Sequence, residues 1–145
     1  MRGYLADTNV LLALAWPNHA HHRDAERWLL SLGTRRWATC ATIELGFVRL
    51  SAHPSFTSNP KLPAASLALL DELTRVGHHE SWAEPKGGIR APVTRRFLER
   101  AASHGQVTDA FLVAIASSHG GKLATFDGAL KVLYPGDVEL VVAGR

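Results

Sequence analysis

The stretch YLADTNVLLAL, residues 4–14, places the carboxylate of Asp7 between two apolar runs. Residues 3–6 have the composition of a short buried strand, and residues 9–15 predict a helix. A carboxylate between two buried elements costs free energy unless its charge is compensated, so Asp7 needs an explanation beyond packing. Ligands of open parallel sheets bind beyond the carboxyl ends of the strands, and we expect Asp7 at that edge.

Strand-like and helix-like segments alternate along the rest of the chain. The further strand-like segments span residues 35–40, 78–83, 121–126 and 137–143. The further helix-like segments span residues 22–32, 42–52, 64–77, 93–105 and 108–121. This alternation predicts an α/β fold, a three-layer α/β/α sandwich with a central, mainly parallel sheet of about five strands. We expect a single domain over residues 1–145.

Two of the helices have the pattern of ordinary core elements. Residues 110–116, AFLVAIA, predict a helix buried on most sides. The residues expected to form a one-sided apolar stripe on the helix over 64–77 are Leu67, Leu70, Leu73 and Val76.

Composition favours a protein of the cytoplasm. The single cysteine cannot form an intrachain disulfide, and no apolar run reaches the roughly 20 residues needed to cross a bilayer. The formal charge of +3 permits a polyanionic partner without requiring one. Possible RNA contacts form a local basic cluster of Arg90, Arg95, Arg96 and Arg100, whose alternative role is a solvated helix face.

Four acidic side chains are expected at one edge of the sheet. Asp7 and Asp127 follow strand-like runs, Asp109 opens the apolar helix, and Glu44 lies in the first turn after the second strand. Each has a structural explanation when taken alone. Asp7 and Asp109 can cap helices, and the Asp-Gly pair at 127–128 can form a turn. A capping box is a poor explanation of Glu44 because the position three residues earlier is Ala.

Taken together, the four carboxylates predict a cation site, because like charges in a pocket of reduced dielectric repel one another strongly. A hard divalent ion, Mg²⁺ or Mn²⁺, is the simplest neutraliser. Such an ion can activate water for attack on a phosphodiester. In this hypothesis Asp7 is the central ligand, Asp109 and Asp127 complete the site, and Glu44 holds a second ion or orients the water. Supporting polar groups at the same edge come from Thr8, Asn9 and Thr125.

The motifs LADTNVLLAL, ATIELGFVRL and TDAFLVAIASSHGGKLATFD, in this order, resemble those of the PIN-domain ribonucleases, specifically the VapC-type toxins of bacterial toxin–antitoxin pairs. The resemblance covers about Tyr4 to Asp127 and departs from the family at Leu130, where many members carry an aromatic residue. It implies that residues 1–145 form a single PIN-like nuclease domain with a catalytic quartet of Asp7, Glu44, Asp109 and Asp127. It also implies Mg²⁺-dependent cleavage of RNA, a homodimer, and inhibition by a cognate VapB-type antitoxin.

Two alternatives stay open. The first is a non-catalytic nucleic-acid-binding adaptor, because a fold does not by itself confer activity. The second is a structure-specific DNA nuclease, because a metal-activated water does not need the 2′-hydroxyl of RNA. The retention of all four acids favours an enzyme, and the family resemblance favours RNA.

Overall fold

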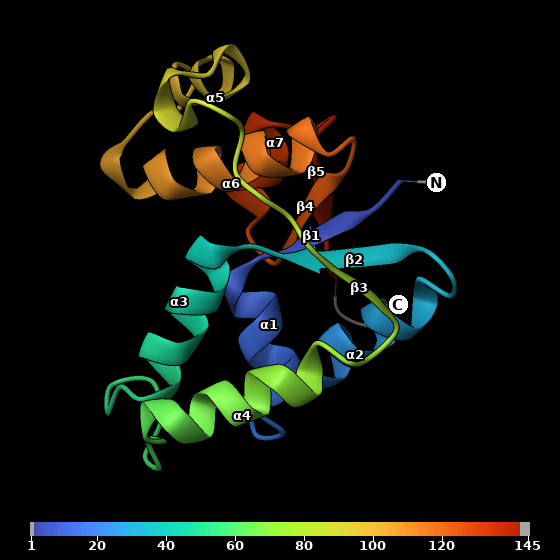
Figure 1. Cartoon of the computed structure of the whole chain (residues 1–145), viewed down its shortest axis with the longest axis vertical. Helices are drawn as coiled ribbons and strands as arrows, with labels where there is room; N and C mark the ends of the chain where they lie inside the picture. The colour runs from blue at the N-terminus through green and yellow to red at the C-terminus, as the bar shows by residue number, and fades with distance from the viewer. Residues whose placement is uncertain (1, 143–145) are drawn as a thin grey trace.

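The computed structural model describes residues 2–142 and is built around a parallel five-stranded sheet (Figure 1). The strands are β1 (Tyr4–Ala6), β2 (Arg36–Thr39), β3 (His78–Ser81), β4 (Lys122–Thr125) and β5 (Val138–Leu140). Their order is β3-β2-β1-β4-β5, and each neighbouring pair is parallel. The predicted parallel sheet of about five strands is confirmed. The last residue of the segment predicted over 137–143 lies outside the described part of the chain.

Helices cover both faces of the sheet, as the three-layer prediction requires (Figure 1). The lower layer in the figure contains α1 (Thr8–Ala15), α2 (His22–Ser31), α3 (Ala41–Ser51) and α4 (Pro63–Leu73). The upper layer contains α5 (Pro92–Leu98), α6 (Val107–Ser118) and α7 (Gly128–Leu133), with the 3-10 turns η1 (Gly88–Arg90) and η2 (His104–Gln106) in the same part of the chain. The two layers follow from right-handed crossovers, because the chain advances in one direction from β1 to β3 and in the other from β3 to β5.

The strand order reverses between β1 and β4, which are neighbours in the sheet although more than a hundred residues separate them. Such a switch point leaves a crevice at the carboxyl ends of the two strands. The hydrophobic core lies on either side of it. Leu11 and Leu12 of α1 are fully buried on one face, and Val113 of α6 is fully buried on the other. The prediction that the helix over 110–116 is largely buried is therefore confirmed. No helix in residues 2–142 combines the length and apolarity needed to span a bilayer.

One of the predicted helices ends well before its predicted last residue, and one further helix was not predicted. The helix predicted over 93–105 stops at Leu98, where hydrogen bonds between residues three apart tighten the last turn. Beyond it the Ala102 amide donates to the Gln106 side chain at 2.8 Å instead of continuing the helix. A helix not predicted at all, α7, begins at Gly128 because Asp127 caps it.

The predicted apolar stripe on α4 is also wrong in part. Leu70 is buried, whereas Leu67 and Val76 are 50% and 47% exposed. The helix ends at Leu73. Residues spaced by three drift around a helix, and nine positions turn it by about 900°, so Leu67 and Val76 would point to opposite sides even if the helix continued.

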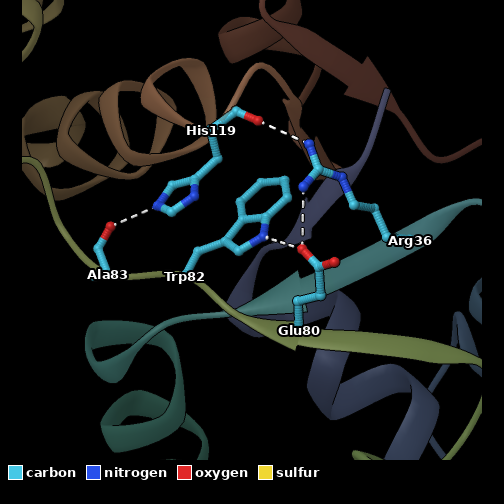
Figure 2. A network of polar contacts seen from close by, with 5 residues as sticks. All are labelled: Arg36, Glu80, Trp82, Ala83 and His119. Carbon is cyan, nitrogen blue, oxygen red and sulfur yellow. Dashed lines mark hydrogen bonds and ion pairs between the residues drawn. The ribbon is translucent and has the colours of Figure 1, made fainter. Parts of the chain in front are cut away.

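A tryptophan pins the chain where it leaves β3 and crosses to the upper layer (Figure 2). The Trp82 indole stacks on the His119 imidazole, with ring centroids 4.9 Å apart and planes 5° from parallel. Its Nε1 donates to Glu80 Oε1 at 2.9 Å, and Arg36 donates to the same oxygen at 3.1 Å. His119 Nε2 donates to the Ala83 carbonyl oxygen at 2.8 Å. These contacts tie β2 and β3 to the end of α6.

The indole packs on the backbone of Gly3 and Gly121, which precede β1 and β4 and have no side chain. A Cβ atom on Gly121 would come within 2.6 Å of both the Gly3 carbonyl oxygen and the Trp82 ring. A glycine is therefore needed at this position for the indole to reach His119.

We predict that Gly121→Ala destabilises the protein by about 1–3 kcal/mol through overpacking, measured as urea-induced unfolding. The matched control is Gly136→Ala, because a Cβ atom there meets nothing within 4 Å. Equal stabilities of the two variants would show that the Trp82 ring can move away from the added methyl group without loss of free energy of unfolding.

Candidate active site

Asp7 occupies the switch point between β1 and β4. It caps α1, and its Oδ1 accepts the Thr8 amide at 2.7 Å. Its Oδ2 accepts the hydroxyl of Thr125, the last residue of β4, at 2.8 Å. Burial raises the pKa of Asp7, the bonds from Thr125 and Thr8 lower it, and the nearby charge of Asp127 raises it again. The net effect is a raised pKa for Asp7. Burial therefore destabilises the ionised form of this carboxylate more than its hydrogen bonds stabilise it.

Thr125 connects Asp7 to the second acid of the site. Its Oγ1 accepts the Asp127 amide at 3.1 Å while donating to Asp7. Asp127 Oδ1 accepts the amides of Ala129 at 2.9 Å and Leu130 at 3.4 Å. Asp127 is therefore a helix cap as well as a member of the acidic edge, and the alternative of a simple Asp-Gly turn is wrong.

Asp109 is the third acid and lies in the first turn of α6. Its pKa is raised to about 6, first by burial and then by the negative charges of Asp7 and Asp127. The structure thus brings three acids, from just beyond the ends of β1 and β4 and from the start of α6, close enough to repel one another. A cation among them would relieve that repulsion.

The three acids line one open pocket of about 710 Å³. Its polar lining also includes Thr8 and Asn9, both expected at this edge, and Arg49 of α3. The remaining lining residues are Thr42, Leu45, Gly46, Val48, Leu50, Thr108 and Leu112. The combination of carboxylate, hydroxyl and amide oxygens suits a hard divalent ion. As placed, however, no three His, Cys, Asp or Glu side chains within residues 2–142 are grouped closely enough to hold one.

Glu44 stands apart from the other three acids. It lies on α3 but does not line the pocket, and its Oε2 accepts the hydroxyl of Thr39 at 2.9 Å. Six residues of α3 line the pocket: Thr42, Leu45, Gly46, Val48, Arg49 and Leu50. At about 100° per residue they cover a little over half of the helix circumference, and Glu44 falls outside this arc. The expected convergence of four acids on one pocket is therefore present for three.

The arginines of the predicted basic cluster lie outside the acidic pocket. Arg90, Arg95 and Arg96 are exposed on η1 and α5 and do not line the acidic pocket. Arg100 donates to the Leu133 carbonyl oxygen and stacks over the Tyr134 ring at 4.9 Å, so it joins α5 to α7. The arginine that does line the pocket, Arg49, was missed in the sequence. Arg49 lies seven residues after Thr42, which puts both on one face of a helix, but only the structure shows that this face lines the pocket.

The family model of the PIN domain matches residues 4–134. Ribonuclease VapC39 of Mycobacterium tuberculosis is 39% identical over 126 residues, which make up 87% of this chain and 89% of that protein. The chain belongs to the VapC-type PIN-domain family. The resemblance seen in the sequence motifs is confirmed.

Solved structures show the same PIN fold. VapC20 of Mycobacterium tuberculosis, described as a sarcin-ricin loop cleaving toxin, superposes with a TM-score of 0.61 at 19% identity, covering 94% of this chain and 98% of that one. FitAcB from Neisseria gonorrhoeae gives a TM-score of 0.59 at 20% identity, covering 93% and 95%. At these identities the likeness concerns the PIN fold alone.

The raised pKa of Asp109 predicts a pH-dependent effect on stability. Because the folded-state pKa of about 6 exceeds the unfolded-state value near 3.8, ionising Asp109 destabilises the PIN domain as pH rises through this interval. Asp109→Asn should therefore raise the melting temperature by a few degrees at pH 8 and have little effect at pH 4.

The measurement is thermal unfolding in a chelating buffer. Asp71→Asn, at an exposed position of α4, is the control for removal of a negative charge. The same increase in both variants would mean that general charge, and not repulsion within the pocket, sets the effect.

Proposed function

We propose that this protein is a Mg²⁺- or Mn²⁺-dependent endoribonuclease toxin that hydrolyses RNA phosphodiester bonds. The observation that carries the proposal is the meeting of Asp7, Asp109 and Asp127 around one open pocket at the switch point of the sheet. The identity of 39% to a ribonuclease, over most of both chains, supports RNA as the substrate.

Each acidic residue has a proposed role. Asp7 is the central ligand because Thr8 and Thr125 fix both of its oxygens. Asp109 and Asp127 complete the cation site directly or through water, and Glu44 serves a second ion or the attacking water. The supporting polar groups are Thr8, Asn9 and Thr125.

The divalent ion would supply positive charge that activates water and stabilises the charge developing on the phosphate. The chain's own residues determine where this chemistry takes place. Thr125 keeps Asp7 and the start of α7 in register through a single hydroxyl. Arg49, on the pocket wall, is placed to bind a phosphate oxygen of the RNA. The exposed arginines Arg90, Arg95 and Arg96 would attract the flanking backbone electrostatically, and Arg100 would do so only in part because it is bonded to Leu133.

We further propose a cytoplasmic homodimer that is inhibited by a cognate VapB-type antitoxin. Membership of the VapC-type family supports this assembly. Large apolar side chains are also exposed near the pocket. Leu45, which lines it, is 72% exposed. Ile89 and Val107, at 56% and 46%, line a second hollow that shares Thr42 and Thr108 with the pocket. Exposed apolar surface of this kind is typical of a protein interface.

Asp7→Asn should abolish metal-dependent RNA cleavage, because it removes one negative charge from the central ligand while the side chain keeps its size. The assay incubates purified protein with total cellular RNA, with and without Mg²⁺ or Mn²⁺, and maps new 5′ ends. Asp71→Asn is again the matched control. Cleavage by Asp7→Asn at the wild-type rate would assign Asp7 another role, and RNA left intact by the wild type would favour the adaptor alternative.

Arg95→Ala combined with Arg96→Ala should weaken RNA binding and flatten its salt dependence. The variant forms fewer phosphate contacts, so its binding releases fewer counterions from the RNA. For single-stranded RNA the slope of log K against log salt should fall by about 1.4. Fluorescence anisotropy with the cleavage-deficient Asp7→Asn protein measures it. The control pair is Arg23→Ala with Arg27→Ala, two exposed arginines on α2 in the opposite layer. Equal slopes in the two double variants would assign Arg95 and Arg96 to ordinary surface charge.

A further inference from the structure

Glu44 is the end of a hydrogen-bond chain that reaches across two strands. Thr39, the fully buried last residue of β2, donates its hydroxyl to Glu44 Oε2 at 2.9 Å. The same hydroxyl oxygen lies 2.8 Å from Nε2 of His79 on β3. The register of β2 and β3 pairs His79 with Trp37, which lies two residues before Thr39. The side chains of Trp37, Thr39 and His79 therefore share one face of the sheet.

The number of protons available decides which group donates and which accepts in each hydrogen bond of this chain. An ionised carboxylate can only accept, so the single hydroxyl proton of Thr39 is given to Glu44. The Thr39 oxygen must then accept from His79, which requires a proton on Nε2. The chain therefore runs from His79 Nε2–H to Thr39 Oγ1–H to Glu44 Oε2.

Packing holds the histidine end of the chain. The Trp37 ring meets the His79 ring edge-on, with centroids 4.8 Å apart and an angle of 64°. Trp37 is itself fixed, because its Nε1 donates to the Val76 carbonyl oxygen at 2.8 Å. Burial lowers the pKa of His79, although the charges of Glu44 and Glu80 oppose the shift. A neutral ring with one proton on Nε2 satisfies all of these contacts.

We propose that Thr39 and His79 are positioning residues that set the orientation of the Glu44 carboxylate beside the acidic pocket. This inference rests on the proposed nuclease function and adds two residues to it that touch neither the pocket nor the substrate. A glutamate on a helix has several rotatable bonds and would otherwise sample many orientations. Partners of this kind commonly change the activity of a site by 10- to 100-fold when they are removed.

The first experiment detects the chain without reference to activity. In ¹⁵N-labelled protein, the His79 Nε2–H proton should give a slowly exchanging signal in the wild type. Thr39→Val, which keeps the shape but lacks the hydroxyl, should lose it, and Thr39→Ser should retain it. A signal that persists in Thr39→Val would contradict the proposed hydrogen bond from His79 to Thr39. His79→Leu assigns the signal.

The second experiment is a double-mutant cycle on RNA cleavage at limiting Mn²⁺. Thr39→Val should lower kcat/KM by about 10-fold or more, and Thr39→Ser should restore it. In a Glu44→Gln background, Thr39→Val should cause no further loss, because the group being positioned is already altered. His79→Leu, at a partly exposed position, provides a second route to the same cycle if Thr39→Val does not fold. Ser81→Ala removes a hydroxyl from the partner of Thr39 in the β2–β3 register and is the control.

The outcomes separate the two proposals. Wild-type activity in Thr39→Val, or an equal loss in both backgrounds, overturns the positioning role while the nuclease function stands. Absence of RNA cleavage by the wild type itself overturns the nuclease function and, with it, the purpose of the chain, whatever the His79 signal shows.

Discussion

The buried carboxylate of Asp7 is the constraint around which the structure is arranged. With 7% of its surface exposed, it has lost most of its hydration, and two hydrogen bonds replace part of it. One comes from the start of α1 and the other from the end of β4, so stabilising this side chain requires both elements to meet at the switch point. Asp109 and Asp127 then approach a charge that water screens poorly, so the three carboxylates repel one another.

Much of the fold could be predicted because short apolar runs between helical patterns determine a parallel sheet and its crossovers. The acids that end β1 and β4 could be placed for the same reason, since strand ends share an edge. The orientation of Glu44 could not, because it depends on Thr39 and His79, which come from separate strands. The missed helix α7 depends on a cap by Asp127, for which sequence alone offered an equally good turn.

Helix α3 joins two different environments. Its pocket face carries Thr42, Leu45 and Arg49, whereas Glu44 faces the end of β2. The helix can lie close to α1 because Gly46 leaves room for Thr8, whose side-chain atoms would be 3.2 and 3.3 Å from a Cβ at that position. A side chain at this position would have to displace Thr8, which lines the same pocket.

The short helix α7 is held at both ends. Asp127 binds its first amides, and just beyond its last turn the Tyr134 hydroxyl donates to the Phe97 carbonyl oxygen at 2.7 Å. Six residues are too few for a helix to persist unaided in water. Through these two contacts α7 connects α5 to Asp127 at the acidic pocket. The position of Asp127 therefore depends in part on α5, a helix that contributes no residue to the pocket.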